Sequence, residues 1–153
     1  MSILARYRKP GGFRQLIKLI ETSQPAKQQQ LLQAIEAEDP HWAQLLRDKK
    51  ITPQMVLDWD MSYLVVIFEH MHTRHCATVL YVLGEGSLHR FRSAFELERL
   101  NELNRLIKGM NEPTEVELRL AYNNMLETVR YLDEDRKIVL SLIDPKLDVS
   151  EAA

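Results

Sequence analysis

The chain has 153 residues, which is the length of one ordinary domain or of two small ones. Its 20 lysines and arginines nearly balance its 22 aspartates and glutamates, and the formal net charge of −2 argues against a protein whose main task is to coat nucleic acid. The single cysteine excludes an intrachain disulfide. The 5 glycines and 6 prolines are too few for a β-sandwich with many tight turns. The longest apolar run, residues 63–68, is too short to span a membrane.

Helix-start signals divide the first third of the chain into short helices. After Gly11 and Gly12, apolar residues recur at i, i+3, i+4 and i+7, starting from Phe13. This spacing places Phe13 and the apolar residues after it on one helical face. Pro25 suits the first turn of a second helix, and Asp39 can cap a third helix that has proline at its first position. We therefore expect three helices before residue 50.

The middle of the chain reads as further helices, with one ambiguous stretch. Pro53 and Asp60 repeat the helix-start chemistry, and the apolar stripe that follows Asp60 belongs to a helix in the middle of the core. The β-branched residues within 63–68 are also compatible with a strand. We favour a helix, because the neighbouring segments read as helices and an isolated strand has no partner.

The second half continues the pattern to the longest helix. Gly84 ends a helix that carries Cys76, and Ser87 can cap a helix that either runs on past Phe95 or breaks near it. Residues 114–117, Thr-Glu-Val-Glu, form a capping box that opens the longest helix. We expect an all-α, α-solenoid-type bundle of about eight or nine helices. Its predicted core includes Phe68, Cys76, Leu80, Met125 and Leu126.

A histidine and cysteine cluster is the most site-like group of residues. His70, His72, His75 and Cys76 lie near a predicted helix junction, and histidine and cysteine are good zinc ligands. Cys76 also falls on an apolar stripe, so it can equally be a small, unreactive core residue with histidines around it. The cluster leaves open a metal- or redox-responsive regulator, although we expect no bound metal or cofactor.

Catalytic signatures are missing from the sequence. It contains no phosphate-binding loop, no nucleophile elbow and no paired Cys-x-x-Cys motif, so we expect no catalytic residues and no enzyme activity. A basic arm with Arg6, Arg8 and Lys9 leaves a small nucleic-acid-binding protein as a further alternative.

Charged residues of both signs are densest between His89 and Lys108. They are Arg90, Arg92, Glu96, Glu98, Arg99, Glu102, Arg105 and Lys108. Such a run can be a solvated helix face with internal salt bridges, or a contact surface for a charged partner helix.

Three segments, in the same order and spacing, resemble the bacterial flagellar motor switch protein FliG over its middle-to-C-terminal region. The first is residues 31–43, LLQAIEAEDPHWA, preceded by the Gly11–Gly12 helix start. The second is residues 55–60, MVLDWD, with the helix 64–71. The third is Pro113 with residues 121–138, AYNNMLETVRYLDEDRKI.

The resemblance implies an armadillo-like fold and a non-enzymatic role in binding flagellar switch or motor proteins, or other copies of the chain through stacked helical halves. We divide the chain into a basic arm (1–10), a first half (11–50), a FliG-like half (51–143) and a frayed tail (144–153). The single cysteine and the short apolar runs indicate a cytoplasmic chain without membrane insertion, and the balanced charge argues against nucleic-acid binding. The resemblance adds a location peripheral to the inner membrane at the flagellar base.

The resemblance also selects partner-binding residues. The expected contacts are Gly11, Gly12, Phe13, Arg90, Arg92, Glu96, Glu98, Arg99, Glu102 and Arg105. Arg99 matches the arginine of the family's torque helix, but Leu106, Ile107 and Lys108 stand where the family has an acidic pair. The chain shows no counterpart of the family's N-terminal domain or of its EHPQ motif.

Overall fold

The structure, a computed structural model, describes residues 2–149. Within that range it holds ten α-helical segments, three of them five residues or shorter, and three short 3-10 helices. No strand occurs among the described residues, and the ambiguous stretch lies in helix α5 (Met61–His70). The all-α helical bundle expected from the sequence is therefore confirmed.

The chain divides into two compact units. The N-terminal unit comprises Met1–Thr52 together with Val139–Ala153, and the central unit comprises Pro53–Ile138. The expected division at residue 50 lies close to the first boundary. The second boundary differs from the expectation, because the chain returns at residue 139 to the unit in which it began.

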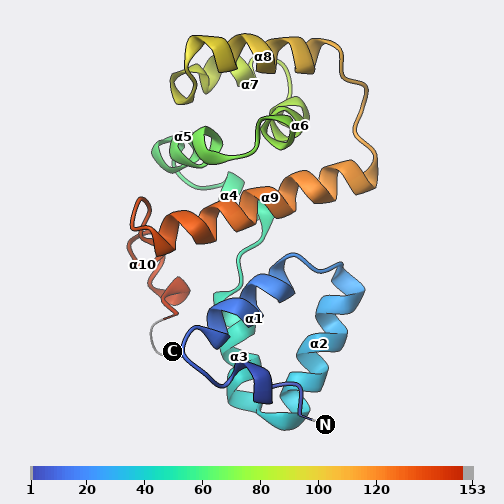
Figure 1. The fold of residues 1–153 in the computed structure, drawn as a ribbon, viewed down its shortest axis with the longest axis vertical. Coiled ribbons are helices and arrows are strands. Elements are labelled where there is room, and N and C mark those ends of the chain that lie inside the picture. The colour runs from blue at the N-terminus through green and yellow to red at the C-terminus, as the bar shows by residue number, and fades with distance from the viewer. Residues whose placement is uncertain (1, 150–153) are drawn as a thin grey trace. The chain divides into compact units, whose positions relative to one another are not determined.

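The N-terminal unit is built on three helices and two returning turns (Figure 1). Its elements are η1 (Ala5–Tyr7), α1 (Gly12–Glu21), α2 (Pro25–Glu38), α3 (Pro40–Lys49), α10 (Leu140–Ile143) and η3 (Pro145–Leu147). Helix α2 packs against α3, and η3 also packs against α3. The Asp39 carboxylate starts α3 by accepting hydrogen bonds from the backbone N–H groups of His41 and Trp42, at 3.0 and 3.2 Å. This is the cap that the Asp-Pro pair predicts.

Both ends of the described chain contribute to the interior of this unit. Leu4 is fully buried, and Leu147 and Val149 are nearly so. The backbone N–H groups of Ile3 and Leu4 donate to the Glu38 carboxylate at 2.6 and 3.1 Å. Residues 2–10 of the expected basic arm are therefore tied to this unit, and residues 144–149 are a folded turn rather than a frayed tail. Residues 150–153 of the expected tail lie outside the described range.

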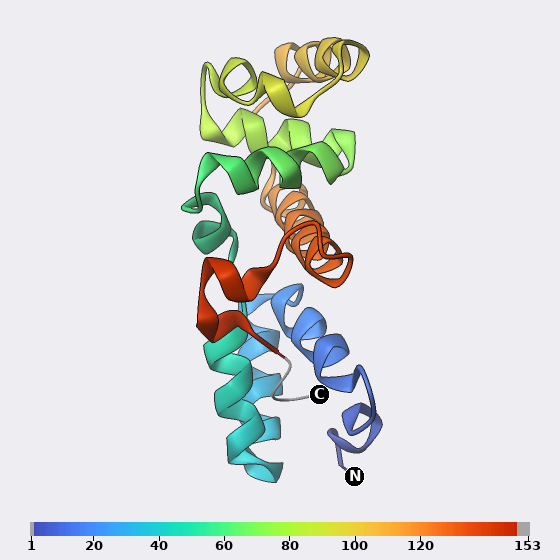
Figure 2. The same ribbon diagram turned by 90° about the vertical axis from the view of Figure 1, so that its left-hand side faces the viewer.

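The central unit has three layers, which Figures 1 and 2 show from two sides. Its elements are α4 (Pro53–Leu57), α5, α6 (Thr73–Leu83), α7 (Ser87–Arg90), η2 (Arg92–Ala94), α8 (Leu97–Lys108) and α9 (Glu115–Glu134). Helix α6 contacts both α8 and α9, and α5 contacts η2 and α9. The pair α5–α6 thus separates the layer of α7, η2 and α8 from α9.

The core of the central unit is the one expected from the helical stripes. Phe68, Cys76, Leu80, Met125 and Leu126 are all buried. The capping box is also present, since the Thr114 hydroxyl accepts from the backbone N–H of Glu117 and the Glu117 carboxylate accepts from that of Thr114. One expected cap differs: Gly86 is the N-cap of α7, and the Ser87 hydroxyl instead donates to the carbonyl of Leu80 at 2.5 Å.

Candidate functional site

The charged run between His89 and Lys108 is broken into three short elements. Helix α7 ends at Arg90, η2 covers the next turn, and Phe95 and Glu96 are extended before α8 begins. At this break an aromatic ring packs into the interior. The Phe91 ring meets the Phe68 ring edge-on at a centroid distance of 4.9 Å. Of the two alternatives open from the sequence, the structure has the break near Phe95.

The charged face of α8, defined here as Glu98, Glu102 and Arg105, points into solvent. The three residues are spaced i, i+4 and i+7, so they share one side of the helix, and all three are exposed. None of them forms an ion pair with any of residues 2–149. Glu96, at the N-cap of α8, is likewise exposed. The salt-bridged surface that the charge pattern also allowed is therefore not what the structure has.

Arg99 lies on a different side of α8 and is held by the protein itself. Its guanidinium donates to the carbonyls of Glu69 and Met71, both at 2.5 Å, and to the Thr73 hydroxyl at 3.2 Å. It also lies 5.1 Å from the centroid of the Phe95 ring. These carbonyls belong to the C-terminal end of α5, where unsatisfied carbonyl groups and the helix dipole favour a cation. Arg99 is thus a fixed structural contact inside the central unit.

Arg90 and Arg92 are exposed but partly engaged. The Arg90 guanidinium lies 5.3 Å from the centroid of the Phe91 ring. Arg92 donates through Nη1 to the His89 carbonyl at 2.7 Å and contacts the His89 Nε2 at 3.0 Å. Both arginines therefore border the layer of α7 and α8 with their charge still accessible.

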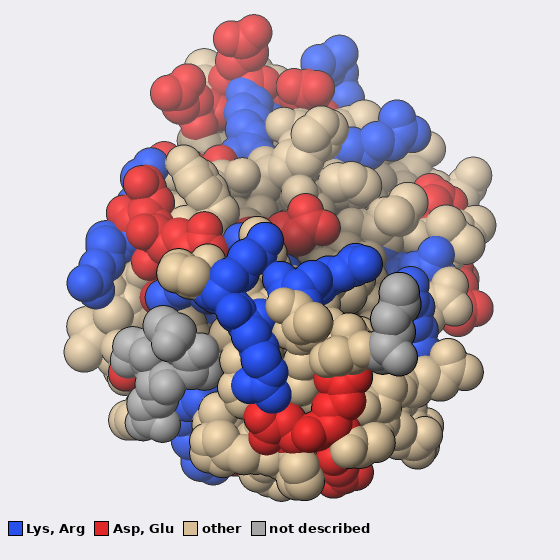
Figure 3. All heavy atoms as spheres, turned by 60° about the horizontal axis from the view of Figure 1, so that its bottom comes forward, with Lys and Arg blue, Asp and Glu red and all other residues tan. Residues whose placement is uncertain are grey.

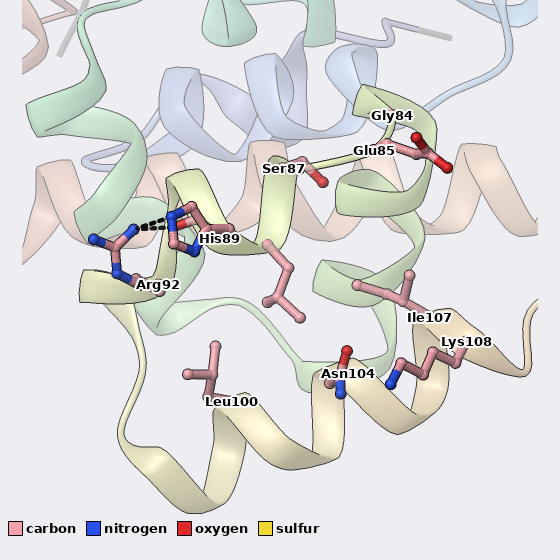
Figure 4. A pocket seen from close by; sticks show the side chains of 11 residues that line it. Gly84, Glu85, Ser87, His89, Arg92, Leu100, Asn104, Ile107 and Lys108 are labelled. Carbon is pink, nitrogen blue, oxygen red and sulfur yellow. Dashed lines mark hydrogen bonds between the residues drawn. The ribbon is translucent and has the colours of Figure 1, made fainter.

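A groove of about 600 Å³ lies between the loop after α6, helix α7 and helix α8 (Figure 4). Residues 84–89 and Arg92 form one wall, and Leu100, Asn104, Ile107 and Lys108 from α8 form the other. Nothing in the sequence pattern singled out this groove, because its two walls come from segments that the fold brings together.

The histidine and cysteine cluster does not converge on one point. The His72 and His75 rings are neighbours at a centroid distance of 5.5 Å, whereas His70 contacts the Val66 carbonyl through Nδ1. Burial raises the pKa of the Cys76 thiol to about 12, although the positive charge of Arg99 opposes this. Across residues 2–149 no three His, Cys, Asp or Glu side chains are grouped so that they could hold a metal ion.

The surroundings of His75 shift its pKa. Partial burial lowers the pKa of His75 below its usual value of 6.5, and the neighbouring His72 lowers it further, while Glu127 acts in the opposite direction. The neutral imidazole is therefore favoured in the folded chain.

The predicted contact residues at the start of α1 shape the interior instead of the surface. Phe13 is buried and meets the Trp42 ring edge-on at 5.4 Å. A Cβ atom on Gly12 would lie 1.8 Å from the Tyr7 carbonyl oxygen, so this position has room for glycine alone. Of the three predicted residues, Gly11 is the exposed one.

The basic segment before α1 is also engaged within its own unit. Arg8 forms an ion pair with Asp39 at 2.8 Å and lies 5.1 Å from the Trp42 ring. On the face seen in Figure 3, Lys and Arg side chains lie next to Asp and Glu side chains and do not form a patch of one sign. Arg8 is therefore engaged by residues of the N-terminal unit.

Comparisons with known proteins found no matching family model, no matching curated protein and no matching solved structure. Among the described residues, no helix has the length and apolar character needed to cross a membrane.

Proposed function

We propose that this chain is a non-enzymatic protein-interaction module of the FliG type, which binds flagellar switch or motor components from the cytoplasmic side of the inner membrane. The observation that carries the proposal is the charged face of α8, where Glu98, Glu102 and Arg105 are exposed and make no ion pair within residues 2–149. Unpaired charges of both signs raise the association rate of an interface and select its partner. They contribute little to the stability of a fold.

A role without catalysis is supported by the state of the chain's single thiol. Cys76 is buried and its pKa is raised to about 12, so the thiolate that nucleophilic or redox chemistry requires is disfavoured at neutral pH. Within residues 2–149 no three His, Cys, Asp or Glu side chains are grouped to hold a metal ion, so we prefer the interaction role to the metal- or redox-responsive alternative.

The resemblance to FliG suggests the class of partner. The position of Arg99 changes which residues we assign to the partner contact. A surface contact through Arg99 would require its guanidinium to leave the carbonyls of Glu69 and Met71. We therefore assign partner contact to the charged face of α8 and to Arg90 and Arg92, and a supporting role to Arg99.

The test exchanges two charges without changing the net charge. The double variant Glu102→Arg with Arg105→Glu should fold like the parent, since both side chains are exposed. It should bind purified switch proteins and the cytoplasmic part of the stator, from the organism that encodes this chain, about tenfold more weakly or worse, as measured by calorimetry. Lys27→Glu, at an exposed position of α2, is the control.

Two results would count against the proposal. If the parent chain binds none of these flagellar proteins, the FliG-type role is wrong. If the exchanged variant binds as well as the parent, the charged face is a solvated helix surface and the contact lies elsewhere.

A further inference from the structure

The groove between α7 and α8 is elongated along the axis of α8. Leu100, Asn104, Ile107 and Lys108 follow each other at i, i+4, i+7 and i+8, so one side of the helix forms the whole wall. At 1.5 Å per residue this wall is about 12 Å long, which corresponds to roughly two helical turns of another chain. A trough of this kind suits a polypeptide segment better than a compact small molecule.

The floor of the groove is apolar. Leu88, Leu100 and Ile107 line it and are only partly buried, so their side chains keep contact area for another molecule. Leu97, one turn before Leu100 on the same side of α8, is 73% exposed. The apolar surface therefore extends past the end of the groove.

The rim of the groove is positively charged where it meets this floor. Figure 4 shows the Lys108 side chain running along α8 toward Asn104, and the Glu85 carboxylate directed away from the groove. Arg92 stands on the opposite wall and uses only Nη1 in hydrogen bonds with residues 2–149. Lys108 thus lies beside the apolar floor and Arg92 stands at the end of the opposite wall with its guanidinium next to His89, while the one acid of the lining points elsewhere.

We propose that this groove binds an acidic amphipathic helix of a partner protein. Leucine-like side chains of the partner pack on Leu88, Leu100 and Ile107, and its carboxylates pair with Arg92 and Lys108. Charge complementarity selects this occupant, since a basic segment would place like charges against both walls. The inference rests on the proposed function in requiring a protein partner, but it concerns a surface separate from Glu98, Glu102 and Arg105.

The test uses synthetic helices on the full chain. One probe is an alanine-based peptide with leucines at i, i+3 and i+7 and glutamates on both sides of them, and a second has lysines in place of the glutamates. Titrations followed by ¹⁵N–¹H spectra should give shifts confined to residues 84–92 and 97–108. The acidic probe should bind at least about tenfold more tightly than the basic one.

Three variants locate the binding. Lys108→Glu should weaken the acidic probe about tenfold or more and strengthen the basic one, and Asn104→Trp should block both by filling the groove. Lys27→Glu, the same charge reversal at an exposed position of α2 outside the groove lining, should change nothing. Asn104 is exposed, so its substitution leaves the fold intact.

The outcomes separate the groove from the charged face. Equal binding of the two probes, shifts that map elsewhere, or an equal loss in Lys27→Glu would overturn the groove assignment. So would sedimentation showing a dimer in which the groove residues are protected, because the occupant would then be a second copy of the chain. Loss of motor-protein binding in Glu102→Arg with Arg105→Glu, with the acidic probe still bound, would support both proposals.

Discussion

Two charged segments, residues 2–10 and α8, use their charges differently in the fold. In the first, Arg8 pairs with Asp39, and the backbone beside it donates to Glu38. In the second, Glu102 and Arg105 are exposed and make no ion pair within residues 2–149. The first segment uses charge to hold the chain together, and the second leaves charge available to another molecule. Charge density alone does not distinguish these two roles.

Helix α8 contains the same contrast within itself. Arg99 and Arg105 are six positions apart, yet Arg99 is bonded to the end of α5 and Arg105 is exposed. The contrast can be tested by substitutions whose expected effects on folding differ in size.

The largest effect should come from the interior beneath the charged segment. Phe68 is fully buried and packs edge-on against Phe91. Phe68→Ala should lower the free energy of unfolding by about 3–5 kcal/mol, because it leaves a cavity. Urea titration measures this loss, with Leu97→Ala as a control that should change stability by less than about 0.5 kcal/mol. A loss under about 1 kcal/mol for Phe68→Ala would show that the core is assigned incorrectly.

The next effect separates the two arginines of α8. Arg99→Met should cost about 1–3 kcal/mol, because it leaves the carbonyls of Glu69 and Met71 without their charged donor. Arg105→Met should stay within about 0.5 kcal/mol. Lysine in place of Arg99 should not restore stability fully, since one ammonium group cannot reproduce the forked geometry. Equal costs for the two methionine variants would abolish the contrast.

Local signals in the sequence were sufficient for much of the fold. The caps at Asp39 and Asp60, the stop at Gly84 and the capping box at Thr114 all depend on residues within one helical turn. The buried stripes follow equally from helical periodicity. These features could be predicted because their physical causes lie close together in the chain.

The features that decide the candidate site are long-range and could not be predicted in this way. Arg99 bonds to residues about thirty positions earlier, and the groove joins the loop after α6 to α8. Leu147 and Val149 return to a unit that begins at the other end of the chain. Periodicity carries no information on such contacts, so Arg99 was expected on the polar surface and residues 144–149 were expected to fray.

A smaller effect should come from the ion pair of Arg8 in the segment of residues 2–10. The Arg8 guanidinium holds the pKa of Asp39 below its usual value of 3.8, assisted by the backbone N–H of Trp42. A carboxylate whose pKa is lower in the folded chain than in the unfolded chain stabilises the fold at pH values above the unfolded-state pKa. This stabilisation is lost as the pH falls through the folded-state pKa. The Trp42 indole resonance should therefore titrate with a midpoint below 3.8, and Arg8→Ala should raise that midpoint. Arg8→Ala should change the free energy of unfolding little at neutral pH, since the Arg8 side chain is 49% exposed.

The smallest effect should be a weak acid sensitivity of the central unit. His75 has a pKa lowered by burial and by His72, so the unfolded chain binds a proton more readily than the folded chain at this site. Stability should then fall as pH drops below about 6.5, and the loss should level off below the folded-state pKa. His75→Gln should flatten this part of the pH profile, measured by urea titration between pH 7 and pH 5. If His75→Gln leaves the slope unchanged, the sensitivity has another source, and the His72–His75 pair makes no measurable contribution to folding.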